Sequence, residues 1–410
     1  MIRALRLETT LFDLFSGGAY DFYWEDPTWS VIGDAVPTKV GPEGNLRASN
    51  PEGSERPTWL ALLPYEAFRG AEEGTDLRAA SPWSEPVWGK IRACISLHKP
   101  TGQIWAAAEN ESDLRGLVRR GSRSHAASAV HAHFSDADEL HEARIVEAMK
   151  SLHAGDSYLI NLARTLLLEC DAPLSLVRSN ASRFTFAWRL VDPSGNRQQE
   201  RTVVAESPEL AFSLEGDTMV SEPMKGTRPR GEDAVQDRAA YDDLRTSLKE
   251  DRELTMAVDL HRNDFSKVCR PGSVRVGFGP TFHRAGVYGM QQRVFGKLND
   301  AQTLGDLLHA LLPMGSVTGA PKKRTMEILA RLEERRRGLY TGIFGMMREN
   351  GDAVFPMAIR TSCFIGSSGE LGVGGGISIG SDPALETRET YWKTRRFWSD
   401  EKLARMSHYQ

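Results

Sequence analysis

The stretch Ser221-Glu222-Pro223-Met224-Lys225-Gly226-Thr227-Arg228-Pro229-Arg230-Gly231 follows a strand-like run from Leu210 to Val220. Two prolines bracket Lys225 and stiffen the chain around it. Gly226 allows a positive φ or a close backbone approach directly after the lysine. We predict a stiff loop that holds one amine at the end of a strand, which is a suitable way to position a nucleophile. Taken alone, the stretch fits a solvated basic loop better, so the surrounding motifs must decide.

The composition indicates a soluble globular protein. The chain of 410 residues is 40% hydrophobic and 26% charged, and a chain of this length can bury a sizeable core. Its formal net charge is −4 and it has no basic stripe or tail, which argues against a nucleic-acid partner. The cysteines form no Cys-x-x-Cys pair, which predicts a reducing compartment and no structural zinc. They are Cys94, Cys170, Cys269 and Cys363.

The N-terminal residues lack the apolar segment that is typical of a signal peptide. No apolar run reaches the ~18 residues that a membrane span requires. We therefore expect a cytoplasmic protein that makes no contact with a membrane.

The sequence divides into three regions. Residues 1–108 combine strand-like runs with polar loops and are predicted to form an N-terminal lobe. Residues 109–134 are rich in Ser, Arg and His and are interpreted as a linker with one short helix at 112–119. In residues 135–410, long helical patterns alternate with groups of strands that can pair as hairpins. This order predicts an α+β fold, a layered α/β sandwich of two packed β-sheets flanked by helices, rather than a doubly wound parallel sheet.

Local patterns predict further boundaries. Ser135 with Asp138 resembles a helix capping box. The glycine-rich segment 372–376 is interpreted as a tight turn before a helix. The other predictions are a loop over 33–57, helices over 173–180, 237–258, 321–337 and 382–405, and a strand over 353–363.

A carboxylic acid lies at the other end of the strand-like run that leads to Lys225. The segment Glu206-Ser207-Pro208-Glu209 directly precedes that run. If the two ends of the run meet, a carboxyl group and an amine face one pocket as an acid–nucleophile pair. The alternative is a surface turn, because Ser-Pro is a common turn signal.

Two carboxylate pairs repeat one helical spacing. Glu250 and Glu253 lie three apart on one predicted helix. Glu386 and Glu389 repeat that spacing on the last predicted helix, with Lys393 one turn beyond. Residues at i and i+3 share a helix face, so the two pairs can converge on one hard cation such as Mg²⁺. The alternative is two solvated helix faces with an i,i+4 Glu–Lys pair.

Two further motifs suit an anionic ligand. The segment Gly315-Ser316-Val317-Thr318-Gly319-Ala320-Pro321-Lys322 directly precedes a predicted helix, and backbone amides at a helix N-terminus bind anions. Ile359-Arg360-Thr361 ends a predicted strand, and arginine binds carboxylates in a bidentate manner. The alternatives are a tight turn and an ordinary surface arginine. Together the motifs suggest a substrate with two carboxylates, one held by Mg²⁺ and one by arginine, with a lysine and a glutamate beside the reacting ring.

The order of these motifs resembles the chorismate-utilising enzymes. This family includes anthranilate synthase component I, aminodeoxychorismate synthase component I, isochorismate synthase and salicylate synthase. The resemblance covers roughly residues 135–405 and implies the fold of that family. The motifs that carry it are Ser207-Pro208-Glu209, Lys225 to Gly231, Val258-Asp259-Leu260-His261-Arg262-Asn263-Asp264, Gly315 to Lys322, Ile359-Arg360-Thr361 and Glu386-Thr387-Arg388-Glu389.

The resemblance implies a role for each matching residue. Lys225 is expected to attack C2 of the chorismate ring, and Glu209 to protonate the departing C4 hydroxyl as the general acid. The cofactor is expected to be Mg²⁺, which holds the ring carboxylate. The expected metal site consists of Glu253 and Glu389, with Glu250 and Glu386 behind them. The expected substrate-binding residues are Gly226, Thr227, Thr318, Tyr340, Arg360, Gly374, Gly375, Gly376 and Lys393.

Three positions separate the reactions within the family. Aminodeoxychorismate synthases of the lysine-bearing kind have lysine where this chain has Lys225, whereas the other members usually have alanine. Isochorismate and salicylate synthases have a water-activating lysine where this chain has Leu159. Anthranilate synthases have a histidine, linked to pyruvate elimination, where this chain has Gly289. These positions predict amination of chorismate by ammonia at C4 to give 4-amino-4-deoxychorismate, for p-aminobenzoate and folate synthesis.

The ammonia requires a source. No cysteine lies in a glycine-rich nucleophile elbow, so the resemblance implies a separate glutamine amidotransferase subunit, with free ammonium as a substitute. The Leu-Leu-Glu-Ser element of the tryptophan pocket in anthranilate synthases has no clear match here, and Ser16-Gly17-Gly18-Ala19 is a candidate for the equivalent place. Anthranilate synthase component I, isochorismate synthase and a non-catalytic chorismate-binding subunit remain alternatives, and the intact set of Glu209, Lys225, Glu253 and Glu389 argues against the last.

Overall fold

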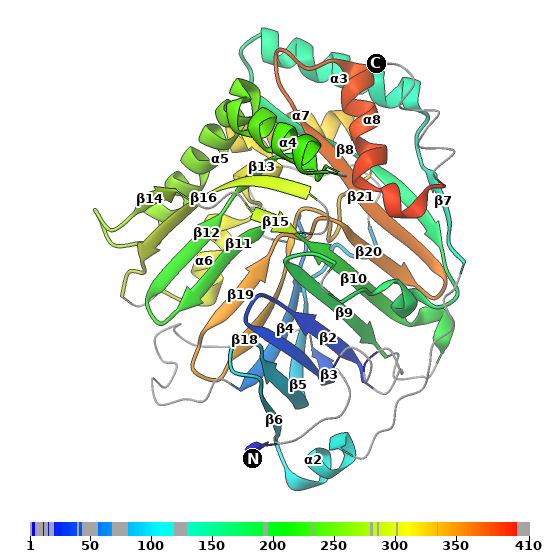
Figure 1. The fold of residues 1–410 in the computed structure, drawn as a ribbon, viewed down its shortest axis with the longest axis vertical. Coiled ribbons are helices and arrows are strands. Elements are labelled where there is room, and N and C mark those ends of the chain that lie inside the picture. Colours follow the sequence, from blue (N-terminus) through cyan, green and yellow to red (C-terminus); the bar gives the residue numbers. More distant parts are fainter. Residues whose placement is uncertain are drawn as a thin grey trace.

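The structure of the chain, a computed structural model, combines antiparallel strands with helices. It describes residues 2–4, 11, 15, 20–38, 41–42, 56–67, 81–118, 129–179, 181–191, 196–231, 233–278, 282–284, 287–300, 302–333 and 335–399. Figure 1 shows most of the helices at one end of the molecule and the N-terminus at the opposite end. The helices at the first end are α3 (Asp138–His153), α4 (Ala234–Thr246), α5 (Leu248–Ser266), α7 (Lys322–Leu332) and α8 (Pro383–Lys393). None of the helices in these ranges is long and apolar enough to cross a membrane.

The strands form a continuous antiparallel ladder with two arms that β5 (Val87–His98) joins. One arm leads from β3 (Trp29–Thr38) through β2 (Phe22–Glu25), β9 (Phe184–Leu190), β10 (Arg201–Ser207), β20 (Thr361–Ile365), β21 (Ser368–Ile377) and β8 (Leu159–Glu169) to β7 (His131–Phe134). The other leads from β4 (Pro57–Leu63) through β18 (Ile343–Arg348), β19 (Ala353–Pro356), β11 (Leu210–Glu215) and β12 (Thr218–Glu222) to β16 (Val287–Lys297). The smaller elements are β1 (Ile2–Ala4), β6 (Gln103–Ala108), α2 (Glu111–Val118), β14 (Arg275–Phe278), β15 (Phe282–Arg284), α6 (Leu304–Leu311) and β17 (Gly319–Ala320).

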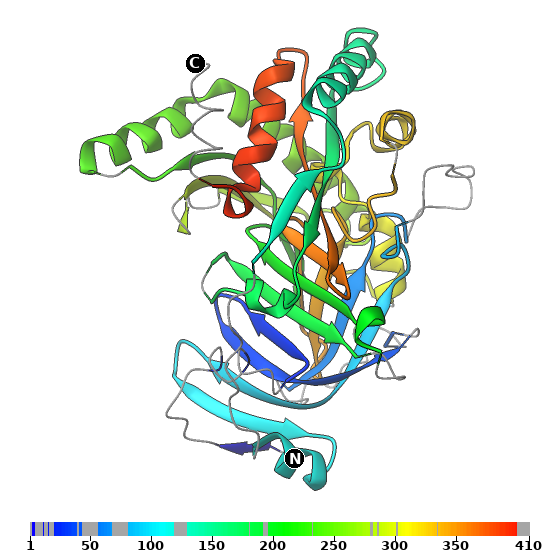
Figure 2. The same cartoon turned by 90° about the vertical axis from the view of Figure 1, so that its right-hand side faces the viewer.

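The core between the two arms is aromatic. Phe186 of β9 stacks on Phe344 of β18 with 5.2 Å between ring centroids, and Trp24 of β2 meets both rings edge-on. All three side chains are fully buried, and contacts of this geometry add to the hydrophobic stabilisation. The cluster therefore packs the arms face to face, and Figure 2 shows the same layers from the side. The predicted fold class, an α+β layered sandwich with flanking helices, is confirmed.

Strands of the predicted N-terminal lobe pair directly with the predicted catalytic region. β2 pairs with β9, and β4 pairs with β18. α2 lies where the sequence predicts a short helix. β7, at the end of the predicted linker, pairs with β8 and so belongs to the sheet. The division into 1–108, 109–134 and 135–410 stays a prediction.

The predicted helix over 237–258 is wrong, because two helices meet at Ser247. This residue has φ −70° and ψ 106°, an extended conformation that ends α4. Its hydroxyl accepts a hydrogen bond from the Glu250 amide and so begins α5. A serine that binds backbone amides favours the start of a helix over its interior. Glu250 consequently lies in the first turn of α5.

The predicted capping box at Ser135 and Asp138 is also wrong. The Ser135 hydroxyl donates to Asp136 at 3.2 Å. The residue that precedes α3 is Ala137, which makes no side-chain cap. Asp138 instead accepts a hydrogen bond from the Arg164 guanidinium.

The predicted strand over 353–363 is interrupted between β19 and β20, where Arg360 has φ 51°. A residue with a positive φ cannot continue an extended strand. Four other boundaries differ from the prediction. β3 extends to Thr38, into the predicted loop, and Pro173–Leu176 forms a 3₁₀ turn in place of a helix. α7 ends at Leu332 instead of residue 337, and α8 ends at Lys393 instead of residue 405. Ser16 to Ala19 and residues 401–410 lie outside the described residues.

Candidate active site

Lys225 lies in a short strand rather than in the predicted loop. The strand is β13 (Met224–Pro229), which pairs with β16, and its register shifts between Lys225 and Thr227. The shift falls on Gly226, which has φ 67°. Pairing with β16 satisfies the backbone amides that a free loop would leave to solvent, and the irregularity at Gly226 turns the chain directly after the lysine. The Thr227 backbone lies opposite Gly289, and its side chain lies outside the described structure.

Gly226 also allows a carboxylate to approach the backbone. A Cβ at this position would lie 2.7 Å from a Leu244 methyl group and 3.0 Å from the Glu250 carboxyl group. Any side chain would therefore push α4 and α5 away from β13. Arg228 of the same strand donates to Glu250 at 3.2 Å, which fixes the carboxylate beside the glycine.

Lys225 and Glu209 meet at Ser316. Lys225 Nζ donates to the Ser316 carbonyl at 3.1 Å. The Ser316 hydroxyl donates to Glu209 Oε1 at 3.1 Å. Ser316 is fully buried in the 3₁₀ turn Gly315–Val317. The predicted meeting of an amine and a carboxyl group at one site thus occurs, and Ser316, which the sequence prediction left out of the site, joins them.

Glu209 is suited to hold a proton near neutral pH. The residue is 4% exposed, and this burial raises the pKa of its carboxyl group from 4.5 to about 7. Lys225, the Ser316 hydroxyl and the Met224 amide act in the opposite direction and lower the pKa. Burial outweighs them, so Glu209 is a candidate general acid.

The two carboxylate pairs face each other across one lysine. Lys249 Nζ lies 3.4 Å from Glu386 Oε1 and 4.0 Å from Glu253 Oε1. Burial lowers the pKa of Lys249, but Glu386 and Glu253, together with Glu389 and Glu250, outweigh burial and raise the pKa, so the amine is charged. A cation therefore already lies between α5 and α8. The sequence prediction missed this residue, although its place directly before Glu250 was a usable signal.

The prediction of a glycine-rich turn over 372–376 is wrong, because these residues belong to the end of β21. Gly374 pairs with Ala163 of β8, and a Cβ on it would lie 2.1 Å from the Leu162 carbonyl. Glycine weakens a strand interior unless another group must approach closely. Here a carbonyl of the neighbouring strand makes that approach.

The next two glycines of β21 face the charged groups. A Cβ on Gly375 would lie 3.2 Å from Glu386 Oε2 and 3.4 Å from Glu389 Oε2. A Cβ on Gly376 would lie 3.5 Å from Glu253 Oε2 and 3.9 Å from Lys225 Nζ. The bare backbone of β21 therefore forms a wall that the carboxylates and the lysine approach.

Lys393 connects α8 to that wall. Its Nζ donates to the Gly374 carbonyl at 2.7 Å and lies 2.9 Å from Glu389 Oε1. Burial raises the pKa of Glu389, but Lys393 outweighs burial and lowers it. Glu386 has a raised pKa, chiefly because of burial. The two carboxyl groups on α8 thus have pKa values that are shifted in opposite directions.

The donor set suits a hard cation. In the described part of the chain, no group of three or more Asp, Glu, His or Cys side chains is gathered tightly enough to hold a metal as it stands. Glu253 Oε1, however, is buried without a hydrogen bond, and burial raises the pKa of Glu253. An ionised Glu253 therefore requires a compensating charge. The Lys249 ammonium already lies between the two pairs. This ammonium and the unpaired Glu253 oxygen make the set of Glu253 and Glu389, with Glu250 and Glu386, compatible with Mg²⁺.

Tyr340 and Arg360 lie on two interlocked turns. The Thr341 amide donates to the Ala358 carbonyl, and the Ala358 amide donates to the Gly342 carbonyl. Thr341 has φ 61° and Arg360 has φ 51°, and such strained residues persist where surrounding structure fixes them. Among the described residues, no hydrogen bond or ion pair of the Arg360 guanidinium is found, so its five donors are available to a carboxylate.

Tyr340, Thr318 and Leu159 are the remaining residues that the sequence analysis singled out. The Tyr340 ring packs on Gly372, where a Cβ would lie 2.2 Å from the ring. Burial raises the pKa of the Tyr340 hydroxyl. The Thr318 hydroxyl donates to the Met314 carbonyl at 2.9 Å. It therefore holds its own turn, and its contact with a substrate stays a prediction. Leu159 is fully buried and its methyl group lies 3.2 Å from the Cβ position of Gly376.

A family model described as chorismate binding enzyme matches residues 37–399. The chain belongs to this family of chorismate-binding enzymes. The site described above lies within the matched residues, and family membership supports an enzyme that acts on chorismate.

The family relatives include two types of synthase. Anthranilate synthase component 1 of Streptomyces coelicolor is 35% identical over 281 residues, which are 67% of this chain and 52% of that protein. Aminodeoxychorismate synthase component 1 of Bacillus subtilis is 41% identical over 192 residues, which are 47% of this chain and 41% of that protein. The chain spans about half the length of the curated relatives it matches.

Solved structures of chorismate-utilising enzymes share the fold. Anthranilate synthase component I of Streptococcus pneumoniae has a TM-score of 0.72 at 20% identity and covers 96% of this chain and 94% of its own. The menaquinone-specific isochorismate synthase of Escherichia coli has a TM-score of 0.73 at 17% identity and covers 97% of this chain and 93% of its own.

Proposed function

We propose that the chain is an aminodeoxychorismate synthase, which aminates chorismate at C4 with ammonia and releases 4-amino-4-deoxychorismate for p-aminobenzoate and folate synthesis. The observation that carries the proposal is the position of Lys225. Its amine is 3.1 Å from the Ser316 carbonyl, and the Ser316 hydroxyl binds Glu209. An amine and a carboxyl group with a raised pKa thus lie together at Ser316, and the amine also faces Gly376 of β21.

The residues act in two balanced steps. In the first, the neutral Lys225 amine forms a bond to ring C2, the ring double bonds shift, and the C4–O bond breaks. Glu209 gives its proton to the departing hydroxide, so water leaves. In the second, ammonia forms a bond to C4, the double bonds shift back, and the C2–N bond to Lys225 breaks. The carboxylate of Glu209 takes up the proton that the new amine releases.

The carboxylates of the substrate require two cationic partners. In this proposal Arg360 and Tyr340 would hold the enolpyruvyl carboxylate, helped by the amides of Gly374 to Gly376. Glu253 and Glu389, with Glu250 and Glu386, would hold Mg²⁺, which when bound would neutralise and orient the ring carboxylate. Lys393 would assist the same carboxylate.

Two other positions favour this reaction over its relatives. Leu159 and Lys225 both lie near Gly376. Leucine ends in methyl groups and cannot act as a base, which disfavours activation of water. Gly289 lies across from Thr227 in the β13–β16 pair and has no imidazole to abstract a proton. A leucine and a glycine at these positions support amination with retention of the enolpyruvyl group.

The second candidate is anthranilate synthase component I, because relatives with that name match up to 67% of the chain. In that reaction ammonia adds at C2 and pyruvate is eliminated. In the proposed reaction Lys225 attacks C2 itself, so a lysine at this position disfavours the alternative. The component 1 name of the relatives also supports a glutamine amidotransferase subunit as the ammonia source.

Product analysis tests the proposal. The purified chain is incubated with chorismate, Mg²⁺ and ammonium, with or without aminodeoxychorismate lyase. We expect p-aminobenzoate only when the lyase is present. Anthranilate without lyase would establish the second candidate, and isochorismate would show that water reaches the site. Chorismate left unchanged even with an added amidotransferase and glutamine would establish a non-catalytic subunit.

A variant tests the nucleophile separately. Lys225→Ala removes the amine, and we expect it to lose most amination at C4 or to shift the product to anthranilate. Wild-type turnover to 4-amino-4-deoxychorismate in this variant would exclude a covalent role for Lys225.

A further inference from the structure

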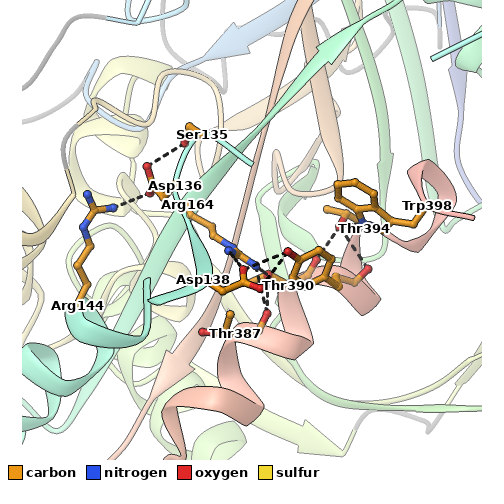
Figure 3. A network of polar contacts seen from close by, with 10 residues as sticks. Ser135, Asp136, Asp138, Arg144, Arg164, Thr387, Thr390, Thr394 and Trp398 are labelled. Carbon is orange, nitrogen blue, oxygen red and sulfur yellow. Dashed lines mark hydrogen bonds and ion pairs between the residues drawn. The ribbon is translucent and has the colours of Figure 1, made fainter. Parts of the chain in front are cut away.

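One buried arginine binds the helix that carries Glu386 and Glu389. Arg164 lies on β8, and its side chain is fully shielded from solvent. Its Nε and Nη2 donate to Thr390 Oγ1 at 3.1 and 2.6 Å, and Nη2 also donates to the Thr387 carbonyl at 3.4 Å. Figure 3 shows the guanidinium directed at α8. Arg164 thus contacts the residue that directly follows each carboxylate in the sequence.

A third element completes the contact. Asp138, the first residue of α3, accepts a hydrogen bond from Arg164 Nη1 at 2.6 Å. The Tyr391 hydroxyl of α8 donates to both Asp138 oxygens at 3.1 Å. The guanidinium also lies 3.6 Å from the Phe134 ring centroid, a cation–π contact. The network therefore joins β8, α3 and α8 (Figure 3).

The geometry of α8 makes this network relevant to the carboxylates. Glu386 and Glu389 share one helix face, and Thr387 and Thr390 share the face that is one residue, or about 100°, further round. Both threonines are almost fully buried. A rotation or slide of α8 at Arg164 would therefore move both carboxylates relative to Glu253 of α5.

We propose that Arg164 is a positioning residue, which fixes the rotation of α8 and so sets the spacing between its carboxylates and Glu253 for a divalent cation. The inference rests on the proposed function, because it concerns the Mg²⁺ that the function requires. Mg²⁺ demands near-ideal octahedral geometry, and groups that orient metal ligands typically change metal affinity about 10–100-fold when they are mutated.

The test compares two arginines. Arg164→Met removes the donors that hold α8, and its partner Asp138 is 39% exposed, so water can solvate the carboxylate that is left. Arg144→Met is the matched control. Arg144 lies 2.6 Å from Asp136, and the two side chains are 10% and 11% exposed. Figure 3 shows Arg144 directed away from α8.

Three measurements are made on each protein: the Mg²⁺ dissociation constant by calorimetry, the hydrogen exchange of amides 383–393, and the unfolding temperature. We expect Arg164→Met to raise the dissociation constant about 10–100-fold and to speed exchange in α8. Arg144→Met should lower the unfolding temperature while leaving Mg²⁺ affinity and α8 exchange unchanged. An unchanged dissociation constant in Arg164→Met, or an equal rise in both variants, would overturn the positioning role.

A milder variant serves if Arg164→Met does not fold. Thr390→Val removes the acceptor of Arg164 at nearly constant side-chain volume, and we expect a smaller rise in the Mg²⁺ dissociation constant. An unchanged constant there would likewise overturn the role. If the wild type binds no Mg²⁺, the metal site of the proposed function is overturned, and this inference with it. If the wild type binds Mg²⁺ and the variants bind it equally well, only the inference fails.

Discussion

Glu209 and Lys225 are held by opposite groups of one residue, since the Ser316 hydroxyl donates to Glu209 and the Ser316 carbonyl accepts from Lys225, each at 3.1 Å. The carbonyl orients the amine, and the hydroxyl orients the carboxyl group. The distance between acid and nucleophile is therefore set by the Gly315–Val317 turn and not only by the strands that carry them.

Ser316→Ala should separate these two functions. The carbonyl remains, so Lys225 keeps its acceptor, but Glu209 loses a hydrogen bond that lowers its pKa. We expect turnover of chorismate to fall about fivefold, because a hydrogen bond of this kind contributes about 1 kcal/mol. We also expect the alkaline limb of the kcat profile to move to higher pH. The control is Ser273→Ala, which removes a partly exposed hydroxyl that donates to the Arg270 carbonyl. An alkaline limb that stays in place would contradict the contact.

The raised pKa of Glu209 predicts a pH-dependent stability. The carboxyl group titrates at about 7 in the folded chain and at 4.5 when unperturbed. Its contribution is therefore fully present below pH 4.5 and is lost as the pH rises through about 7. A difference of this size corresponds to roughly 3 kcal/mol. Glu209→Gln has no charge to bury, so its stability relative to wild type should rise between pH 5 and pH 8 in urea unfolding. Parallel profiles for the two proteins would contradict the assignment.

Lys249 should compete with a divalent cation. Its ammonium lies between Glu253 and Glu386, but its side chain is 55% exposed and can turn towards solvent. Lys249→Met removes the competing charge, so we expect Mg²⁺ to bind about tenfold more tightly at low salt. Lys150→Met, which breaks an exposed pair on α3, is the control. Weaker Mg²⁺ binding in Lys249→Met would show that the lysine assists the metal site.

The helical spacing in the sequence predicted which carboxylates share a face. Residues at i and i+3 share a face in any helix, so this part of the prediction does not depend on the boundary that was wrong at Ser247. Glu253 and Glu386 lie on different helices and both approach Lys249, and their role in a metal site stays a prediction. The α+β fold class followed from the alternation of helices with strand groups, which does not depend on exact boundaries.

Contacts between distant segments could not be predicted in the same way. Ser316 meets Glu209 across 107 residues, and no local pattern encodes that contact. The glycines of β21 were predicted as a turn because glycine is rare inside strands. Their place in the strand depends on the Leu162 carbonyl, which belongs to another strand. Two of the boundaries that failed, at Ser247 and Arg360, are places where one residue leaves the regular backbone conformation.

Gly376→Ala should impair catalysis with little effect on folding. Gly376 has no positive φ to satisfy, and the added Cβ would lie 3.2 Å from a Leu159 methyl group that can shift. It would, however, enter the space between Glu253 and Lys225. We expect kcat/KM for chorismate to fall at least tenfold, a loss of about 1.4 kcal/mol or more in transition-state stabilisation. Gly380→Ala is the control, because a Cβ there meets nothing within 4 Å. Equal kcat/KM in the two variants would remove the glycine wall from the site.

Arg360→Lys tests whether the guanidinium binds a substrate carboxylate. Arginine and lysine each carry one positive charge and a Cβ, so the positive φ of residue 360 costs the wild type and the variant the same free energy. Lysine cannot make the bidentate contact that a carboxylate forms with arginine. We expect KM for chorismate to rise about 10–100-fold, as for the loss of a charged hydrogen bond, while the unfolding temperature stays within a few degrees of wild type. The Glu206 amide donates to the Arg360 carbonyl at 3.1 Å. Arg178→Lys is the control, because Arg178 binds the Glu206 side chain at 2.6 Å while 56% of its own side chain is exposed. A rise in KM in both variants would assign the effect to the Glu206 region as a whole, whereas a normal KM in Arg360→Lys would move the carboxylate contact to another residue.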